Sequence, residues 1–75
     1  MKPYRNLGGD SAVVAYEYWD DFITVEFESG KHTLYTYTYT SAGNFAIETM
    51  KQLADAGHWL NSYIATHKPW YASRA

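Results

Sequence analysis

Residues 34–40 read Leu-Tyr-Thr-Tyr-Thr-Tyr-Thr, a strict alternation of tyrosine with threonine. Side chains of a strand point to opposite faces with a period of two, so this segment is predicted to be a strand with Tyr35, Tyr37 and Tyr39 on one face. A row of tyrosines forms either one wall of a small core or an exposed stacking platform. The two arrangements imply different functions, so the orientation of this row is the first question the sequence raises.

The length and composition limit the classes of protein to which the chain can belong. Seventy-five residues form one domain with a small core, and the eight Tyr, three Trp and three Phe enlarge the apolar area it can bury. The absence of cysteine excludes a disulfide and a thiolate metal site, and it suits a cytoplasmic protein. The net charge of −2 gives no general attraction to nucleic acid or anionic lipid. No apolar run approaches the roughly 20 residues that span a bilayer, and we expect no membrane partner.

Hydrophobic periodicity predicts three strands, at about 12–19, 22–28 and 32–40, followed by two helices at about 42–56 and 58–67. The short connections require an antiparallel meander, and the expected fold is α+β with both helices packed on one face of the sheet.

The positions of glycine, proline and helix-capping residues predict the domain boundaries and the ends of the helices. Residues 1–10 are expected to be a flexible lead-in, 11–68 the single domain and 69–75 a tail. Ser41 and Asn44 are candidate N-caps of the first helix, and Gly57 is its expected C-terminal stop.

The lengths of the turns determine which side chains of neighbouring strands lie on the same face of the sheet. A two-residue turn at Asp20–Asp21 pairs Trp19 with Phe22. It places six apolar or aromatic residues on one face of the first hairpin: Val14, Tyr16, Tyr18, Ile23, Val25 and Phe27.

The second hairpin has two possible registers. A three-residue loop with Gly30 in a G1 bulge pairs Ile23 with Tyr35 and turns the tyrosines toward the helices. A two-residue turn at Ser29–Gly30 pairs Val25 with Leu34 and turns them outward. We favour the first register, because Ser-Gly suits neither a type I′ nor a type II′ turn.

Three short motifs resemble the KTSC domain, a bacterial family named for the C-terminal region of some lysyl-tRNA synthetases. They are Val-Glu-Phe-Glu-Ser-Gly at 25–30, Tyr-Thr-Tyr at 35–37 and Gly-His-Trp-Leu-Asn-Ser-Tyr-Ile at 57–64. The chain departs from the family where Ser41 replaces a frequent proline and where the segment before Gly57 is longer. The resemblance implies a bacterial or phage protein of uncharacterised role, for which RNA binding has been suggested.

The residues that match the family motifs are expected to be mainly structural: Gly30, Tyr35, Tyr37, Gly57, Asn61 and Ile64. Asn61 stands among apolar residues, and two interpretations of it remain open. Its amide either bonds to the backbone of a neighbouring loop and orients the second helix, or it contacts a ligand.

Neither a catalytic nor a metal-binding pattern is present in the sequence. His32, His58 and His67 lack metal-ligand spacing, and no glycine-rich phosphate loop occurs. We therefore expect a protein without cofactor or metal that is not an enzyme.

The expected function is a small accessory or protein-interaction module. Its candidate surface, which also suits self-association, consists of five apolar and aromatic residues: Trp19, Phe22, Leu34, Trp70 and Tyr71. The alternative is an RNA-binding module that uses the tyrosine strand and the basic tails, provided the termini lie close together. The acidic residues of the sheet region disfavour that alternative, because carboxylates repel phosphates.

Overall fold

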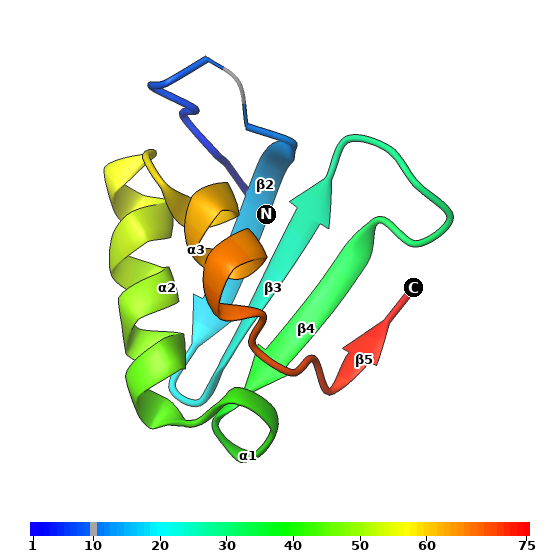
Figure 1. Cartoon of the computed structure of the whole chain (residues 1–75), viewed down its shortest axis with the longest axis vertical. Helices are drawn as coiled ribbons and strands as arrows, with labels where there is room; N and C mark the ends of the chain where they lie inside the picture. Colours follow the sequence, from blue (N-terminus) through cyan, green and yellow to red (C-terminus); the bar gives the residue numbers. More distant parts are fainter. Residues whose placement is uncertain (10) are drawn as a thin grey trace.

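The computed structural model describes residues 1–9 and 11–75, so Asp10, the last residue of the expected lead-in, lies outside the described residues. The described chain forms an antiparallel sheet in the order β1-β2-β3-β4-β5, with helices on one face (Figure 1). The strands are β1 (Lys2–Pro3), β2 (Val13–Trp19), β3 (Phe22–Phe27), β4 (Leu34–Thr38) and β5 (Ser73–Arg74). The helices are α1 (Tyr39–Ala42), α2 (Asn44–Ala56) and α3 (Leu60–His67). The α+β class is confirmed.

The prediction of only three strands and two helices is wrong, because both ends of the chain add an edge strand and α1 precedes the long helix. Lys2 pairs with Tyr16 at one edge, and Arg74 pairs with Tyr35 at the other. Strands of two residues carry no hydrophobic alternation, so sequence periodicity cannot reveal them. The expected lead-in and tail therefore contain backbone that is hydrogen-bonded into the sheet.

The first hairpin confirms the two-residue turn, with Trp19 opposite Phe22 and Tyr16 opposite Val25. A bulge then shifts the register between Val13 and Ala15. The bulge puts Val13, which is 1% exposed, in the core and leaves Val14 39% exposed. The expectation that Val14 faces the core is wrong, because a bulged residue reverses the alternation beyond it.

The second hairpin places its side chains on the predicted faces of the sheet, but its loop differs from the prediction. Ile23 lies opposite Tyr37 and Val25 opposite Tyr35, two residues away from the predicted pairing. The backbone N–H of Phe27 donates to the carbonyl oxygen of Thr33 at 2.7 Å, so the loop is longer than a G1 bulge allows. A shift of two residues preserves the face of every side chain, and Tyr35 and Tyr37 therefore lie on the helix side as expected.

The tyrosine strand ends earlier than predicted, because Thr38 caps a helix. The Thr38 hydroxyl accepts a hydrogen bond from the Ser41 N–H at 3.0 Å, and the Ser41 hydroxyl accepts one from the Thr38 N–H. Tyr39 thus begins α1, and neither Ser41 nor Asn44 is an N-cap, since Gly43 precedes α2. Gly57 ends α2 in the left-handed conformation, as predicted.

One apolar cluster joins the sheet to the helices. Ile23 and Val25 of β3 and Ile47 and Met50 of α2 are each fully buried. Tyr4 of the N-terminal segment also belongs to this cluster, and its hydroxyl accepts a hydrogen bond from the Leu60 N–H at 3.3 Å. In the described part of the chain no helix has the length and apolarity needed to cross a membrane.

Candidate functional site

A groove of about 580 Å³ opens on the helix side of the sheet, where α3 leaves β4 and β5 partly uncovered (Figure 1). We call it the tyrosine groove. Its floor consists of half-buried or buried side chains from two strands and α3: Phe27, Tyr35, Tyr37 and Ile64. Its rim consists of residues 29–32 of the hairpin loop and of Arg74 of β5. A groove of this volume, apolar at the base and polar at the edge, has the form of a binding site.

The floor is a continuous aromatic surface. Tyr35 and Tyr37 stack with ring centroids 6.4 Å apart, and Phe27 meets Tyr35 edge-to-face at 5.5 Å. Tyr71 supports the floor from outside the groove, because its ring meets that of Tyr35 edge-to-face with centroids 5.2 Å apart. These contacts fix the ring orientations, so the floor is pre-organised.

The Tyr37 hydroxyl is the polar group at the base of the groove. Tyr37 is only 3% exposed, and its hydroxyl has no hydrogen-bond partner among residues 1–9 and 11–75. In the same residues, no buried side-chain polar atom is both sealed from solvent and without a partner. The hydroxyl must therefore reach open space, and the groove is the open space that Tyr37 lines. Burial raises the pKa of Tyr37 to about 12, so the phenol remains a hydrogen-bond donor at neutral pH.

The rim is basic. Lys31 and His32 of the hairpin loop and Arg74 line the groove, and none of the described lining residues is Asp or Glu. Arg74 pairs with Tyr35 across β4 and β5, and its Cζ atom lies 5.2 Å from the centroid of the Tyr71 ring. This cation–π contact orients the guanidinium group at the mouth of the groove.

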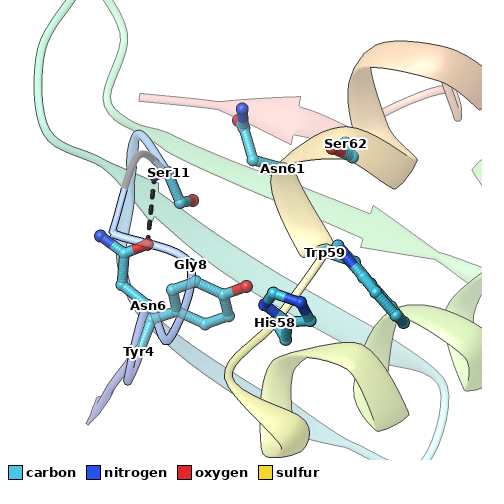
Figure 2. Close-up of a pocket in the computed structure, with 8 residues that line it drawn as sticks. All are labelled: Tyr4, Asn6, Gly8, Ser11, His58, Trp59, Asn61 and Ser62. Carbon is cyan, nitrogen blue, oxygen red and sulfur yellow. Dashed lines mark hydrogen bonds between the residues drawn. The ribbon is translucent and has the colours of Figure 1, made fainter.

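A second pocket, of about 360 Å³, lies between the N-terminal segment and the start of α3 (Figure 2). In Figure 2 the Tyr4 ring lies beside the His58 ring, while Trp59 points away from the N-terminal loop. The polar groups on the loop side bond within the protein: Asn6 Oδ1 accepts from the Ser11 N–H at 3.1 Å, and Ser11 Oγ accepts from the Val13 N–H at 3.0 Å. On the side of the N-terminal loop, the pocket therefore offers a ligand few free polar groups.

Asn61 lines this second pocket and is half-buried. Its side chain makes no hydrogen bond to any other residue that the structure describes, so the predicted bond to loop backbone is not observed there. Figure 2 shows its amide at the edge of α3, above the pocket.

On the same face of the sheet but away from the tyrosine groove, Asp55 of α2 accepts hydrogen bonds from two tyrosines of β2. The Tyr16 hydroxyl donates to Oδ1 at 2.8 Å and the Tyr18 hydroxyl to Oδ2 at 2.5 Å, and the Arg5 guanidinium donates to the Asp55 carbonyl oxygen. The hydrogen bond from Tyr18 is the main cause that lowers the pKa of Asp55 below its ordinary value. Burial and then the bond to Asp55 raise the pKa of Tyr16 to about 12. We call this group the Asp55 clamp; its polar groups are satisfied internally.

The residues of the predicted interaction surface do not form one patch. Trp19 is 74% exposed on the outer face and pairs with Phe22, which is half-buried. Leu34 is opposite Glu26, four residues along β3 from Phe22 and therefore about 13 Å away. Tyr71 contacts Tyr35 on the helix side, and Trp70 is 77% exposed in the segment that leads to β5.

The two termini do not lie close together, although the RNA alternative requires it. β1 and β5 are the opposite edges of the sheet, separated by four strand spacings, or about 19 Å. Lys2 is therefore at one edge and Arg74 at the other.

The sequence singled out part of the tyrosine groove, but as residues that match the family motifs and not as a binding site. Four of the six residues that match the family motifs line it: Gly30, Tyr35, Tyr37 and Ile64. It missed Lys31, His32 and Arg74 as site residues. A hairpin loop and a tail carry no periodic signal, and only the pairing of β5 with β4 brings Arg74 beside Tyr35. Gly57 lies outside the groove, buried against Arg5.

Within the described residues no three His, Asp or Glu side chains are grouped closely enough to hold a metal ion. Comparison with protein-family models, with curated proteins and with solved structures gives no match for this chain. The resemblance to the KTSC domain therefore remains a prediction.

Proposed function

We infer that the protein is a small non-enzymatic interaction module that recognises a segment of a partner protein in the tyrosine groove. The observation that carries this inference is the coincidence of an aromatic floor, a basic rim and the Tyr37 hydroxyl, which opens into the groove, at one place on the surface. Aromatic and arginine side chains dominate the binding energy of protein interfaces, and Tyr35, Tyr71 and Arg74 stand together here.

The groove also contains a serine and a histidine, but they do not favour a hydrolase. Among the described residues, no hydrogen bond joins Ser29 to His32 and no carboxylate lines the groove to orient the imidazole. A binding role uses the aromatic floor and the cations of the rim, whereas an acyl-transfer role would use only these two residues.

RNA binding by the tyrosine strand and the basic tails is the competing proposal. The distance between Lys2 and Arg74 weighs against it, because an electrostatic path for a phosphate backbone needs several cations along one surface. The acidic outer face, with Glu17 and Glu26, weighs against it as well.

Site-specific photo-crosslinking tests the inferred function. The crosslinking amino acid p-benzoylphenylalanine replaces Tyr71 at the groove in one variant and Trp19 on the outer face in another. Each variant is irradiated in a cell extract of the source organism. We expect a discrete protein adduct from position 71 and a much weaker one from position 19, because only the first lies at the recognition surface.

A third variant with the label at Phe45 of α2, which is 78% exposed, measures adduct formation by random collision. An adduct found only from position 19 would mean that the recognition surface is the outer face of the sheet and not the groove. An adduct made of the chain itself, together with a dimer in light scattering, would replace a partner protein by self-association. Nucleic acid crosslinked from position 71 would support the RNA proposal instead.

A further inference from the structure

The tyrosine groove contains hydrogen-bond donors without an acceptor to match them. Tyr37 as a residue is almost fully buried, and its hydroxyl, which has no partner in the described part of the chain, opens into the groove. Lys31 and Arg74 add cationic donors at the rim, and none of the lining residues that the structure describes supplies a carboxylate. A ligand that fits this surface must accept hydrogen bonds and carry negative charge.

Three other tyrosines indicate which side-chain acceptor suits a tyrosine hydroxyl in this fold. Tyr16 and Tyr18 donate to the carboxylate of Asp55, and Tyr39 donates to Glu48 at 2.6 Å. Wherever a tyrosine hydroxyl of this fold donates to another described side chain, that side chain is a carboxylate. A carboxylate is also the planar anion that an arginine guanidinium binds in a bidentate manner.

The floor specifies the neighbour of that carboxylate. Phe27, Tyr35 and Ile64 present an aromatic and aliphatic surface beneath the rim. A fully hydrated anion such as free phosphate would leave this surface uncovered. A ligand that joins an acid to an apolar group covers the floor and meets the donors at once.

We propose that the tyrosine groove binds an acidic side chain of a partner segment in which an aromatic or aliphatic residue adjoins the acid, with the carboxylate held by Tyr37, Lys31 and Arg74. The inference rests on the proposed interaction function and adds the chemistry of the partner. The volume of about 580 Å³ accommodates two or three side chains of such a segment.

The test uses synthetic peptides and NMR titration of the full chain. The probes are acetylated, amidated tripeptides with glutamate between phenylalanine or leucine residues, and counterparts with glutamine in place of glutamate. We expect the glutamate peptides to shift the signals of Tyr35 and Tyr37 and to bind about tenfold more tightly than the glutamine peptides, because charge-assisted hydrogen bonds are lost in the latter.

Variants locate the carboxylate. Arg74→Gln and Lys31→Gln are each expected to weaken the glutamate peptides by about three- to tenfold, and Tyr37→Phe by about threefold. Lys2→Gln removes the same charge at the opposite edge of the sheet, so it is the matched control and should leave the affinity unchanged. Equal affinity for glutamate and glutamine peptides, an equal effect of Lys2→Gln and Lys31→Gln, or no shift with any peptide at millimolar concentration would each overturn the proposal.

A single-stranded oligouridylate is titrated in parallel. If it shifts the groove signals at lower concentration than the peptides do, the ligand is a nucleic acid and the proposal is wrong. Photo-crosslinking at position 71 tests the interaction function separately. An adduct there whose yield falls no more with Arg74→Gln than with Lys2→Gln would retain the interaction function and overturn the ligand class. Peptide selectivity without any adduct would retain the ligand class and overturn the interaction function.

Discussion

Tyr16 and Tyr18 on β2 and Tyr35 and Tyr37 on β4 are two pairs of stacked tyrosines on the same face of the sheet, with ring centroids 6.2 Å and 6.4 Å apart. They flank β3 in two rows: Val25 lies between Tyr16 and Tyr35, and Ile23 lies between Tyr18 and Tyr37. Their surroundings differ. The C-terminal part of α2 brings Asp55 to the first pair, whereas no described carboxylate reaches the second.

The comparison separates what a tyrosine does for the fold from what it offers a ligand. Both pairs bury apolar rings against the helices, and both Tyr16 and Tyr37 have a pKa raised to about 12. Only the first pair has its hydroxyls satisfied within the protein. The Tyr37 hydroxyl of the second pair opens into the groove instead, so the second pair is the side of the molecule that offers a donor to a ligand.

The largest expected effect comes from a side chain added at Gly57, which packs against Arg5 of the Asp55 clamp. Gly57 has φ +71°, and a Cβ atom there would lie 2.7 Å from Arg5 Cβ. Gly57→Ala should therefore lower the free energy of unfolding by about 2 to 4 kcal/mol, combining left-handed strain with displacement of the N-terminal segment. Urea unfolding measures the loss.

Gly9→Ala is the matched control for this substitution. Gly9 has φ +82°, but an added Cβ atom there meets nothing within 4 Å. It should cost only the strain of about 1 kcal/mol. Equal losses in the two variants would show that the contact between Gly57 and Arg5 has no energetic weight.

Asp55→Ala should destabilise the protein by about 1 to 2 kcal/mol at neutral pH, because two tyrosines lose a charged acceptor that solvent partly screens. The folded-state pKa of Asp55 is below its ordinary value of 3.8, so the clamp contributes its full stability above that pH. That stability is lost as the pH falls through the lowered pKa, and the wild-type and variant unfolding curves should converge in acid.

Glu28→Ala, in the exposed hairpin loop, is the control for Asp55→Ala and should change stability by less than about 0.5 kcal/mol. A constant difference between wild type and Asp55→Ala from neutral to acid pH would contradict the role of the ionised carboxylate.

Removing single hydroxyls compares the two pairs directly. Tyr16→Phe should cost about 1 kcal/mol, since it leaves Asp55 with one donor fewer. Tyr37→Phe removes a hydroxyl with no described partner and should change the free energy of unfolding by less than about 0.5 kcal/mol. A loss at Tyr37 as large as that at Tyr16 would mean that the hydroxyl is already satisfied.

The smallest effect, which involves no loss of fold, is on tyrosine titration in Asp55→Asn. The hydrogen bond to Asp55 is the main cause of the raised pKa of Tyr18 and the second cause for Tyr16, whereas burial and neighbouring tyrosines raise that of Tyr37. The variant should therefore lower the pKa of Tyr18 most, that of Tyr16 in part and that of Tyr37 not at all. NMR detection of each ring carbon Cζ follows the three titrations, and a fall at Tyr37 would contradict this assignment.

The sequence by itself determined the first hairpin, the alternation of the tyrosine strand, the long helix and its stop at Gly57, and it favoured the correct face for the tyrosines. These features depend on local preferences: alternation sets the side-chain direction of a strand, and glycine adopts the left-handed conformation at low cost. Even the incorrect register left Tyr35 and Tyr37 on the correct face, because it differed by two residues.

Only the tertiary structure decided which tyrosines are satisfied and where the groove lies. The pairing of Arg74 with Tyr35 and the hydrogen bonds from Tyr16 and Tyr18 to Asp55 join residues about 40 positions apart. Such contacts depend on backbone pairing at the sheet edges and on the position of α2, neither of which leaves a periodic signal in the sequence. The Tyr-Thr alternation placed Tyr35 and Tyr37 on one face of their strand, and the packing of α2 and β5 made the tyrosine pair of β2 structural and left the pair of β4 facing a groove.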